Sequence, residues 1–407
     1  MDGSTTPHSL VPTRHAALDR LRAFAPKAGG DYARLRNYDL GPGRHVHVSG
    51  LSPYLRHRLL TEDEVLRTVL ARHSAQAAEK FVHEVFWRSY WKGWLEMRPA
   101  VWTDYRTGLA AALNRTQVES GLRQRWSDAC NGQTGIDGFD HWAHELIQTG
   151  YLHNHARMWF ASIWVFTLGL PWELGADFFL RHLHDGDPAS NTLGWRWVAG
   201  LQTRGKTYLA RPDNIARYTE RRFHPAGLAP SAPPLAGPDH PQRRPAPVSP
   251  QWSASRRSGL LLHEDDLSPA YLFETGLAPV SHIRLQTTSG RSPLAVSPLV
   301  TEFAAGALDD AASRWRDRAG DDAGHRDQVD AIADWARAAN LEQIVTPYAP
   351  VGPVAEALDK LDTALAPDGI TVIRPLRPYD ARAWPHATHG FFRFKDQIPQ
   401  LLAAMGL

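Results

Sequence analysis

Tryptophan is unevenly distributed in this chain, and its distribution limits what the chain can fold into. Eleven of the fifteen tryptophans lie between Trp87 and Trp197, more than the filling of a core explains. Within this aromatic background, residues 151–208 carry a polar cluster made of Asn154, Arg157, Asp185, Asp187 and Asn191. A buried polar group without a partner costs on the order of 1–3 kcal/mol. The pattern therefore predicts either a bound ligand that is polar and aromatic or a closed polar network.

The composition is that of a globular protein of two or three domains, with 407 residues, 43% of them hydrophobic and 22% charged. The formal net charge is only +2, so an anionic partner must be met by a local patch of arginines. A single cysteine, Cys130, excludes a disulfide framework and a cysteine-ligated iron–sulfur cluster and predicts a reducing cytoplasm. No signal peptide is apparent, and the best candidate for a membrane span, residues 159–170, is too short.

The first half of the chain, residues 32–224, shows helical periodicity with few strand signals and is predicted to be all-α. Thr61, followed three residues later by Glu64, is the signature of a helix N-cap with a capping box. Two more amphipathic helices are predicted at residues 137–149 and 152–168.

Residues 225–250 separate the two halves. They contain nine prolines and few large apolar side chains, a composition that cannot continue a helix. The segment is predicted to be a semi-rigid linker, with a long loop pinned on the domain surface as the alternative.

The second half has a different pattern. Short strand-like runs lie at residues 260–262, 283–285, 343–345 and 370–373. Helical stretches are predicted at residues 296–318, 326–340, 353–366 and 393–404. Strands that alternate with helices favour a parallel sheet in an α/β domain.

Several separated motifs of the first half occur in an order that is typical of one family. They are Tyr32 with Arg36, Val-Ser-Gly-Leu-Ser-Pro (48–53), Glu-Val-Phe-Trp-Arg (84–88), Gly-Gln-Thr-Gly (132–135), His-Asn-His-Ala-Arg-Met (153–158), Asp-Gly-Asp-Pro-Ala-Ser-Asn (185–191) and Gly-Trp-Arg-Trp (194–197). Together they resemble the flavin-binding helical domain of the cryptochrome/DNA photolyase family.

The resemblance implies a fold of class α + α/β. A polar N-terminal segment (1–30), expected to be frayed, precedes an all-helical FAD-binding domain (31–224), the linker (225–250) and a smaller, Rossmann-like α/β domain (251–407). The segment at 387–395 is similar to the end of the family's α/β domain, which in the family usually comes first. We therefore interpret the domain order as a swap that resembles a circular permutation.

The resemblance also implies the cofactor FAD, bound by Tyr32, Ser49, Gly50, Leu51, Ser52, Phe81, Arg88, Asn154, Arg157, Asp185, Asp187, Asn191 and Trp195. The serine-rich loop would face the pyrophosphate. Arg157 and Asp185 would pair beside the isoalloxazine, Asp187 would accept from its pyrimidine edge and Asn191 would lie at N5. An antenna chromophore in the α/β domain is possible, but its identity does not follow from the sequence.

The catalytic residues that the resemblance implies are Glu84, Asn154, Met158, Trp87 and Trp197. Glu84 would stabilise or protonate the radical anion of a pyrimidine dimer, and the two tryptophans would stack on a flipped dimer. The pair of Asn154 and Met158 favours a cyclobutane dimer as the lesion. His153 and His155 leave the (6-4) lesion open.

Electron transfer is expected to pass through Trp195 and then Trp172. The third member of the family's chain is missing, because Glu119 stands near its expected position. Trp126, Trp142 and Trp164 are the alternatives.

The function predicted by the resemblance is light-driven repair of cyclobutane pyrimidine dimers by a deoxyribodipyrimidine photo-lyase. The alternatives are a cryptochrome-type blue-light photoreceptor and a (6-4) photolyase. The expected partner is UV-damaged DNA, double- or single-stranded, bound by a monomer with no membrane contact. No group of ligands shows the spacing of a zinc site, so no metal is predicted.

Overall fold

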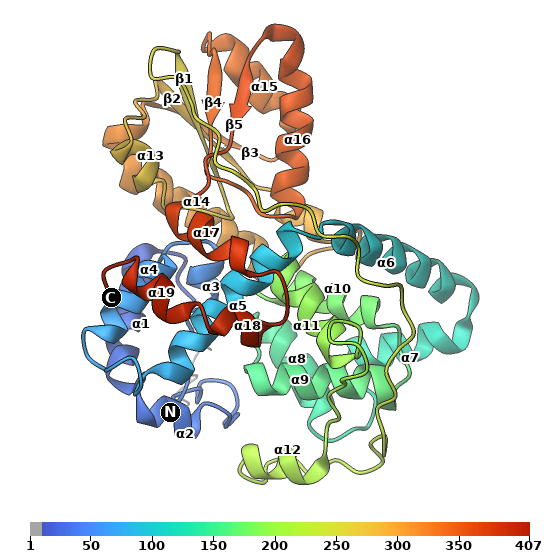
Figure 1. The fold of residues 1–407 in the computed structure, drawn as a ribbon. Helices are drawn as coiled ribbons and strands as arrows, with labels where there is room; N and C mark the ends of the chain where they lie inside the picture. Colours follow the sequence, from blue (N-terminus) through green and yellow to red (C-terminus); the bar gives the residue numbers. More distant parts are fainter. Residues whose placement is uncertain (1–9) are drawn as a thin grey trace, which may run out of the picture.

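The computed structural model describes residues 10–407, and it confirms the predicted fold class. A helical part and a five-stranded parallel α/β part lie one above the other (Figure 1). The helices of the first part are α1 (Arg14–Phe24), α2 (Gly30–Leu35), α3 (Ser52–Arg56), α4 (Glu62–Leu70), α5 (Glu79–Glu96), α6 (Ala100–Val118), α7 (Ser120–Cys130), α8 (Phe139–Thr149), α9 (Asn154–Ser162), α10 (Trp172–His182), α11 (Pro188–Val198) and α12 (Pro212–Tyr218).

Local signals in the sequence set several of these helix ends. The capping box at Thr61 and Glu64 is present in full, because each residue's side chain bonds the other's backbone N–H. Helix α8 ends at Gly150, whose φ of +64° is a left-handed conformation that favours glycine. The expected frayed N-terminus is wrong for residues 14–24. Helix α1 buries a small apolar face there, and the side chain of Thr13 caps it.

The sheet has the strand order β3-β2-β1-β4-β5, and all its pairs are parallel. Its strands are β1 (Ser258–His263), β2 (Ser281–Leu285), β3 (Asp321–Arg326), β4 (Gln343–Val345) and β5 (Thr371–Ile373), with helices α13 (Ala270–Glu274), α14 (Pro298–Ala319), α15 (Val329–Ala338) and α16 (Pro353–Leu365). Sequence reasoning missed β3. Its polar sequence, Asp-Asp-Ala-Gly-His-Arg, carries no hydrophobic signal because it is an exposed edge strand.

The last helices leave the α/β part and pack on the helical part. They are α17 (Pro378–Ala383), α18 (Phe391–Lys395) and α19 (Ile398–Ala403), which lie beside α4 and α5 in Figure 1. Between α17 and α18, Trp384 is fully buried. Its backbone packs so closely on Gly93 of α5 that a Cβ atom at Gly93 would lie only 2.9 Å from the Cα of Trp384. This C-terminal segment contributes side chains to the core of the helical part. The domain boundary that was placed at residue 250 stays a prediction.

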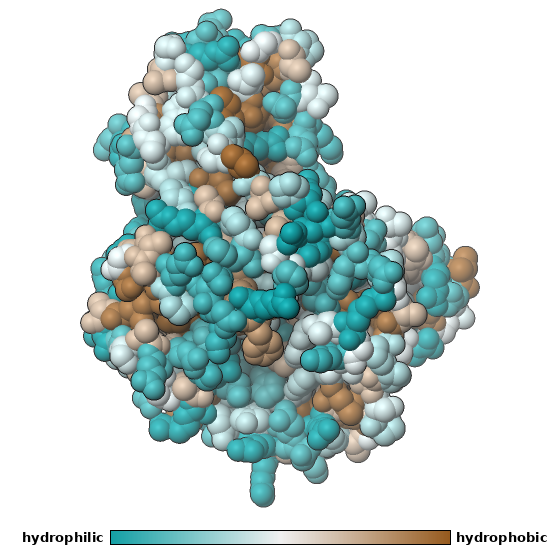
Figure 2. Space-filling view, in the orientation of Figure 1, coloured by the Kyte–Doolittle hydropathy of each residue, from teal (hydrophilic) through white to brown (hydrophobic). Residues whose placement is uncertain are grey.

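The proline-rich segment 225–250 forms neither helix nor strand. The backbone N–H of Leu235 donates to the carbonyl of Ala199 over 3.0 Å, and that of Arg244 donates to Met97 over 2.9 Å. These contacts favour the pinned surface loop over a free linker. The face drawn in Figure 2 is mostly hydrophilic, with its hydrophobic residues in small separate patches. Within residues 10–407, no helix combines the length and hydrophobicity that crossing a membrane requires.

Candidate functional site

Arg157 on α9 and Asp185 in the loop before α11 form the ion pair predicted from the sequence. Arg157 Nη2 donates to Asp185 Oδ2 over 2.9 Å, and Asp185 is buried. Burial acts to raise the pKa of Asp185, but the guanidinium outweighs it and the pKa is lowered. The carboxylate is therefore charged at neutral pH and compensated.

Asp187 and Asn191 begin helix α11 beside this pair. The side chain of Asp187 caps the helix by accepting from the N–H of Ser190 over 2.8 Å. The amide nitrogen of Asn191 donates to the carbonyl of Ala176 over 2.8 Å, which fixes the orientation of the side chain. Both residues are buried, so this helix N-terminus offers a charged and a neutral acceptor in an apolar setting.

Two cations that sequence reasoning missed lie next to Asp187. Lys92 Nζ and Arg56 Nε are 3.8 and 3.9 Å from Asp187 Oδ2, and both cations are buried. Burial opposes the charge of Asp187, but these cations lower its pKa. The only sign of these cations in the sequence was a lysine within the apolar stretch of α5, because a lysine is rarely buried unless it is paired.

The predicted phosphate loop, Ser49 to Ser52, leads into the short helix α3. Gly50 has a φ of +59°, a left-handed conformation that favours glycine. Arg88 on α5 reaches this loop, where its Nη2 donates to the carbonyl of Ser52 over 3.4 Å. The loop and helix α5 thus lie together, as the resemblance implies.

Tyr32 and Phe81 are buried in an aromatic cluster with Phe24. The ring centroids of Tyr32 and Phe81 are 5.3 Å apart, and those of Phe24 and Phe81 are 5.0 Å apart. Packing of the helices accounts for these contacts, and the predicted role of both residues in cofactor binding stays a prediction.

The predicted catalytic residues Glu84, Asn154 and Met158 keep access to solvent. Glu84 Oε1 accepts from Arg36 Nη1 over 2.5 Å, and its side chain is 35% exposed. Burial by the surrounding protein raises the pKa of Glu84, although Arg36 opposes this shift. Asn154 is exposed at the start of α9, and Met158 is half-buried one turn later.

The two predicted stacking residues differ in what covers them. Trp87 is stacked on Phe391 of α18, with ring centroids 3.7 Å apart and an interplanar angle of 11°. Trp197 is half-buried and lies 6.0 Å from the ring of Tyr208. One face of Trp87 is therefore occupied by the chain itself.

One of the three alternatives considered above, Trp164, is an aromatic neighbour of a predicted electron carrier, whereas the neighbours of Trp172 are other residues. The ring of Trp195 lies 6.1 Å from Trp164. Trp172 lies 5.7 Å from Tyr105, which is 5.2 Å from Trp102. Trp102 donates its indole N–H to Glu356 of α16 over 2.8 Å. The ring contacts of Trp172 thus lead to α6, a path that spacing in the sequence does not reveal.

Several buried polar atoms of these residues have no hydrogen-bond partner within the described chain. They include Asp185 Oδ1, Arg88 Nη1, Lys92 Nζ and Trp195 Nε1. Unpaired buried polar atoms are costly. Here Asp185, Arg88 and Trp195 are predicted cofactor-binding residues, and Lys92 lies next to another, Asp187. The donor and acceptor set fits a ligand with a polar heteroaromatic ring and phosphates, as FAD has.

One group of side chains has the spacing of metal ligands. Ligand atoms of Asp39, His45 and Glu145 all lie within 4.8 Å of one another. Asp39 already accepts from Trp142 Nε1 over 3.0 Å and lies 3.3 Å from the guanidinium of Arg222. The charge of Asp39 is thus compensated by the protein.

Comparison with known proteins finds similarity to DNA photolyases over part of the chain. A family model described as the FAD binding domain of DNA photolyase matches residues 81–227. The deoxyribodipyrimidine photo-lyase of Thermus thermophilus is 34% identical over 48% of this chain and 45% of its own length, and that of Neurospora crassa is 30% identical over 54% and 36%. Among solved structures, a class III photolyase from Agrobacterium tumefaciens is 26% identical over 51% of this chain and 43% of its own, with a TM-score of 0.43.

Residues 81–227 thus match the FAD-binding domain of DNA photolyase, and the comparisons support a relationship of this chain to the cryptochrome/DNA photolyase family. The chain spans less than half the length of these curated relatives.

Proposed function

We propose that this protein repairs cyclobutane pyrimidine dimers in DNA in a light-dependent reaction that uses FAD. The observation that carries the proposal is the placement of Glu84 and Arg88 one turn apart on α5. Side chains at this spacing share a helix face, and Arg88 touches the phosphate loop. Glu84 therefore lies about one helical turn from a residue of the cofactor site and faces partly to solvent.

The chemistry that FAD supplies when bound and reduced is the transfer of one electron under blue or near-UV light, returned after the dimer splits. The residues of this chain prepare the site for it. Arg157 and Asp185 keep a buried charge pair at the cofactor, and Asp187 offers an acceptor to a ring N–H. Burial raises the pKa of Glu84 although Arg36 opposes the shift, so this carboxyl takes up a proton more readily than an exposed one and is placed to pass it to a dimer that has gained negative charge.

The proposed lesion class is supported by the histidines near Asn154. Burial lowers the pKa of His153 and of His155, so both rings are neutral at pH 7. A neutral imidazole is a poor general acid, which disfavours the (6-4) lesion. Asn154 and Met158, which keep access to solvent, remain as the residues proposed to contact a cyclobutane dimer.

The test is repair of UV-damaged oligothymidine by the reduced, FAD-loaded protein. Under blue light we expect thymine absorbance to recover, while a dark sample and a sample of oxidised protein at low light dose stay unchanged. Absence of light-dependent recovery with FAD bound would contradict the proposal.

A photoreceptor that binds FAD without repair is the second candidate. The observation that favours it is the stacking of Phe391 on Trp87, which leaves less of the indole for a lesion. Tight binding of intact and damaged oligonucleotides with equal affinity, and no repair, would support this candidate.

A further inference from the structure

The loop after β1 in the α/β part reaches the residues predicted to hold the flavin. Asp265 Oδ1 accepts from Arg56 Nη1 over 2.5 Å, and the side chains are 5% and 3% exposed. Arg56 also donates from Nε to the carbonyl of Gly186 over 2.9 Å. Gly186 lies between Asp185 and Asp187, so a single guanidinium joins the α/β part to the candidate cofactor site.

Charges alternate along this contact. Asp265 is followed by Arg56, Arg56 by Asp187 at 3.9 Å, and Asp187 by Lys92 at 3.8 Å. All four side chains are buried, and Lys92 Nζ has no hydrogen-bond partner in the described chain. In such a low-dielectric setting, removal of one charge is felt by its neighbours far more strongly than in water.

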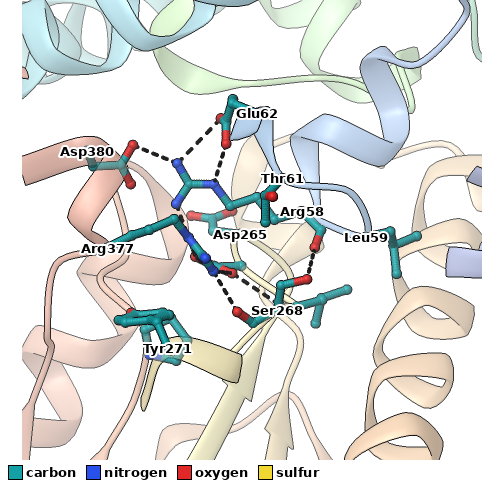
Figure 3. A network of polar contacts seen from close by, with 12 residues as sticks. Arg58, Leu59, Thr61, Glu62, Asp265, Ser268, Tyr271, Arg377 and Asp380 are labelled. Atoms are coloured by element: carbon teal, nitrogen blue, oxygen red, sulfur yellow. Dashed lines mark hydrogen bonds and ion pairs between the residues drawn. The ribbon is translucent and has the colours of Figure 1, made fainter. Parts of the chain in front are cut away.

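A second buried network crosses the same interface without touching Asp187. Arg58 contacts Glu62 and lies 2.7 Å from Asp380 and 3.0 Å from Asp266, while Arg377 pairs with Asp266 over 2.7 Å (Figure 3). Arg58, Glu62, Asp266 and Asp380 are as buried as the residues of the first contact, whereas the side chain of Arg377 is 11% exposed. A substitution in this second network weakens the same interface without removing a contact to Arg56 or Asp187, so it serves as a control.

We infer that Asp265 is a positioning residue that couples the α/β part to the flavin site through Arg56 and Asp187. Asp265 shares the guanidinium with Asp187 and so limits how much positive charge Arg56 presents to the cofactor. The reduction potential of the flavin therefore depends on this contact, and so on how the α/β part packs against the helical part. This inference rests on the proposed contact of Asp187 with FAD.

The experiment is a reductive titration of the full-length, FAD-loaded protein. Asp265→Asn removes one negative charge and keeps the side-chain volume, so we expect the midpoint potential to shift to more positive values. Asp265→Glu should restore the potential of the parent protein. Asp380→Asn, in the second network, should lower the melting temperature and shift the potential less than Asp265→Asn does, because Asp380 does not contact Arg56 or Asp187.

Each other outcome contradicts a distinct statement. Equal potentials for the parent protein and Asp265→Asn, or equal shifts for Asp265→Asn and Asp380→Asn, would overturn the coupling. A parent protein that retains no FAD would instead overturn the proposed function. If Asp265→Asn does not fold, Asp265→Ser removes the same charge with a smaller side chain and repeats the test.

Discussion

The indole of Trp87 in α5 and the phenyl ring of Phe391 in α18 are stacked almost parallel, with centroids 3.7 Å apart. Phe391 comes from the C-terminal segment, more than three hundred residues after Trp87. The stack joins the end of the chain to the helix that carries Glu84 and Arg88. The C-terminal segment therefore belongs to the surroundings of the candidate lesion site.

Phe391→Ala should destabilise the protein by about 3–5 kcal/mol, because Phe391 is buried and its removal leaves a cavity beside Trp87. The neighbouring Phe392 is 81% exposed, so Phe392→Ala should change the free energy of unfolding by less than about 0.5 kcal/mol. Urea denaturation of both variants measures the difference. Equal effects of the two substitutions would contradict the packing described here.

Glu84→Gln should retain FAD and repair damaged oligothymidine poorly, because an amide is a weaker hydrogen-bond donor than the carboxylic acid and cannot transfer a proton. Glu79→Gln changes an exposed carboxylate near the start of the same helix and should repair like the parent protein. Flavin absorbance and the recovery of thymine absorbance are measured on each sample. Loss of FAD from Glu84→Gln would make Glu84 a structural residue.

Arg157→Met should lose bound FAD and destabilise the protein by about 3 kcal/mol, because it leaves the carboxylate of Asp185 buried without its partner. Arg115→Met breaks an exposed pair with Glu119 and should change the free energy of unfolding far less, because solvent screens the two charges. Chemical denaturation and gel-filtered flavin content test both expectations. Full retention of FAD by Arg157→Met would exclude Arg157 from the cofactor site.

Acid should weaken the interface between the two parts through Asp266. Burial acts to raise the pKa of Asp266, but Arg377 and Arg58 lower it from 3.8 to about 2. A carboxylate with a lowered pKa contributes stability above its unfolded pKa, and this contribution, about 2 kcal/mol, is lost as the pH falls from about 4 through 2. Asp266→Asn should be less stable at pH 7 and lose less stability over that pH interval. Parallel pH profiles for the two proteins would show that Asp266 does not titrate as described.

Trp172→Phe should slow photoreduction of oxidised FAD and leave repair by chemically reduced protein unchanged, because only the first process needs an electron from the protein. Tyr105→Phe tests the ring next to Trp172. Trp126→Phe replaces a tryptophan with no ring contact to Trp172 and serves as the control. The rate of flavin absorbance change under blue light is the measurement. Equal slowing by Trp126→Phe would contradict a path through α6.

Short-range patterns predicted much of this protein. The capping box at Thr61 and the parallel strands β1, β2, β4 and β5 follow from residue type and spacing, and the pairing of Arg157 with Asp185 was implied by the family resemblance. These features depend on periodicity and on local chemistry, which a sequence records directly. Strand β3 was missed because its residues are polar, and its pairing with β2 supplies the stabilisation instead.

Contacts between distant segments were decided only by the tertiary structure. Lys92 and Arg56 belong to no recognisable motif, yet both lie next to Asp187. Phe391 stacks on Trp87. Asp265 accepts a hydrogen bond from Arg56, 209 positions away in the sequence. The physical reason is that a buried charge or ring is stabilised by whichever group packing brings within reach, whatever their separation in the chain. The sequence by itself determined the helical flavin-type half, the α/β half and the motif residues of the site. The tertiary structure decided how the second half and the C-terminal helices close upon that site.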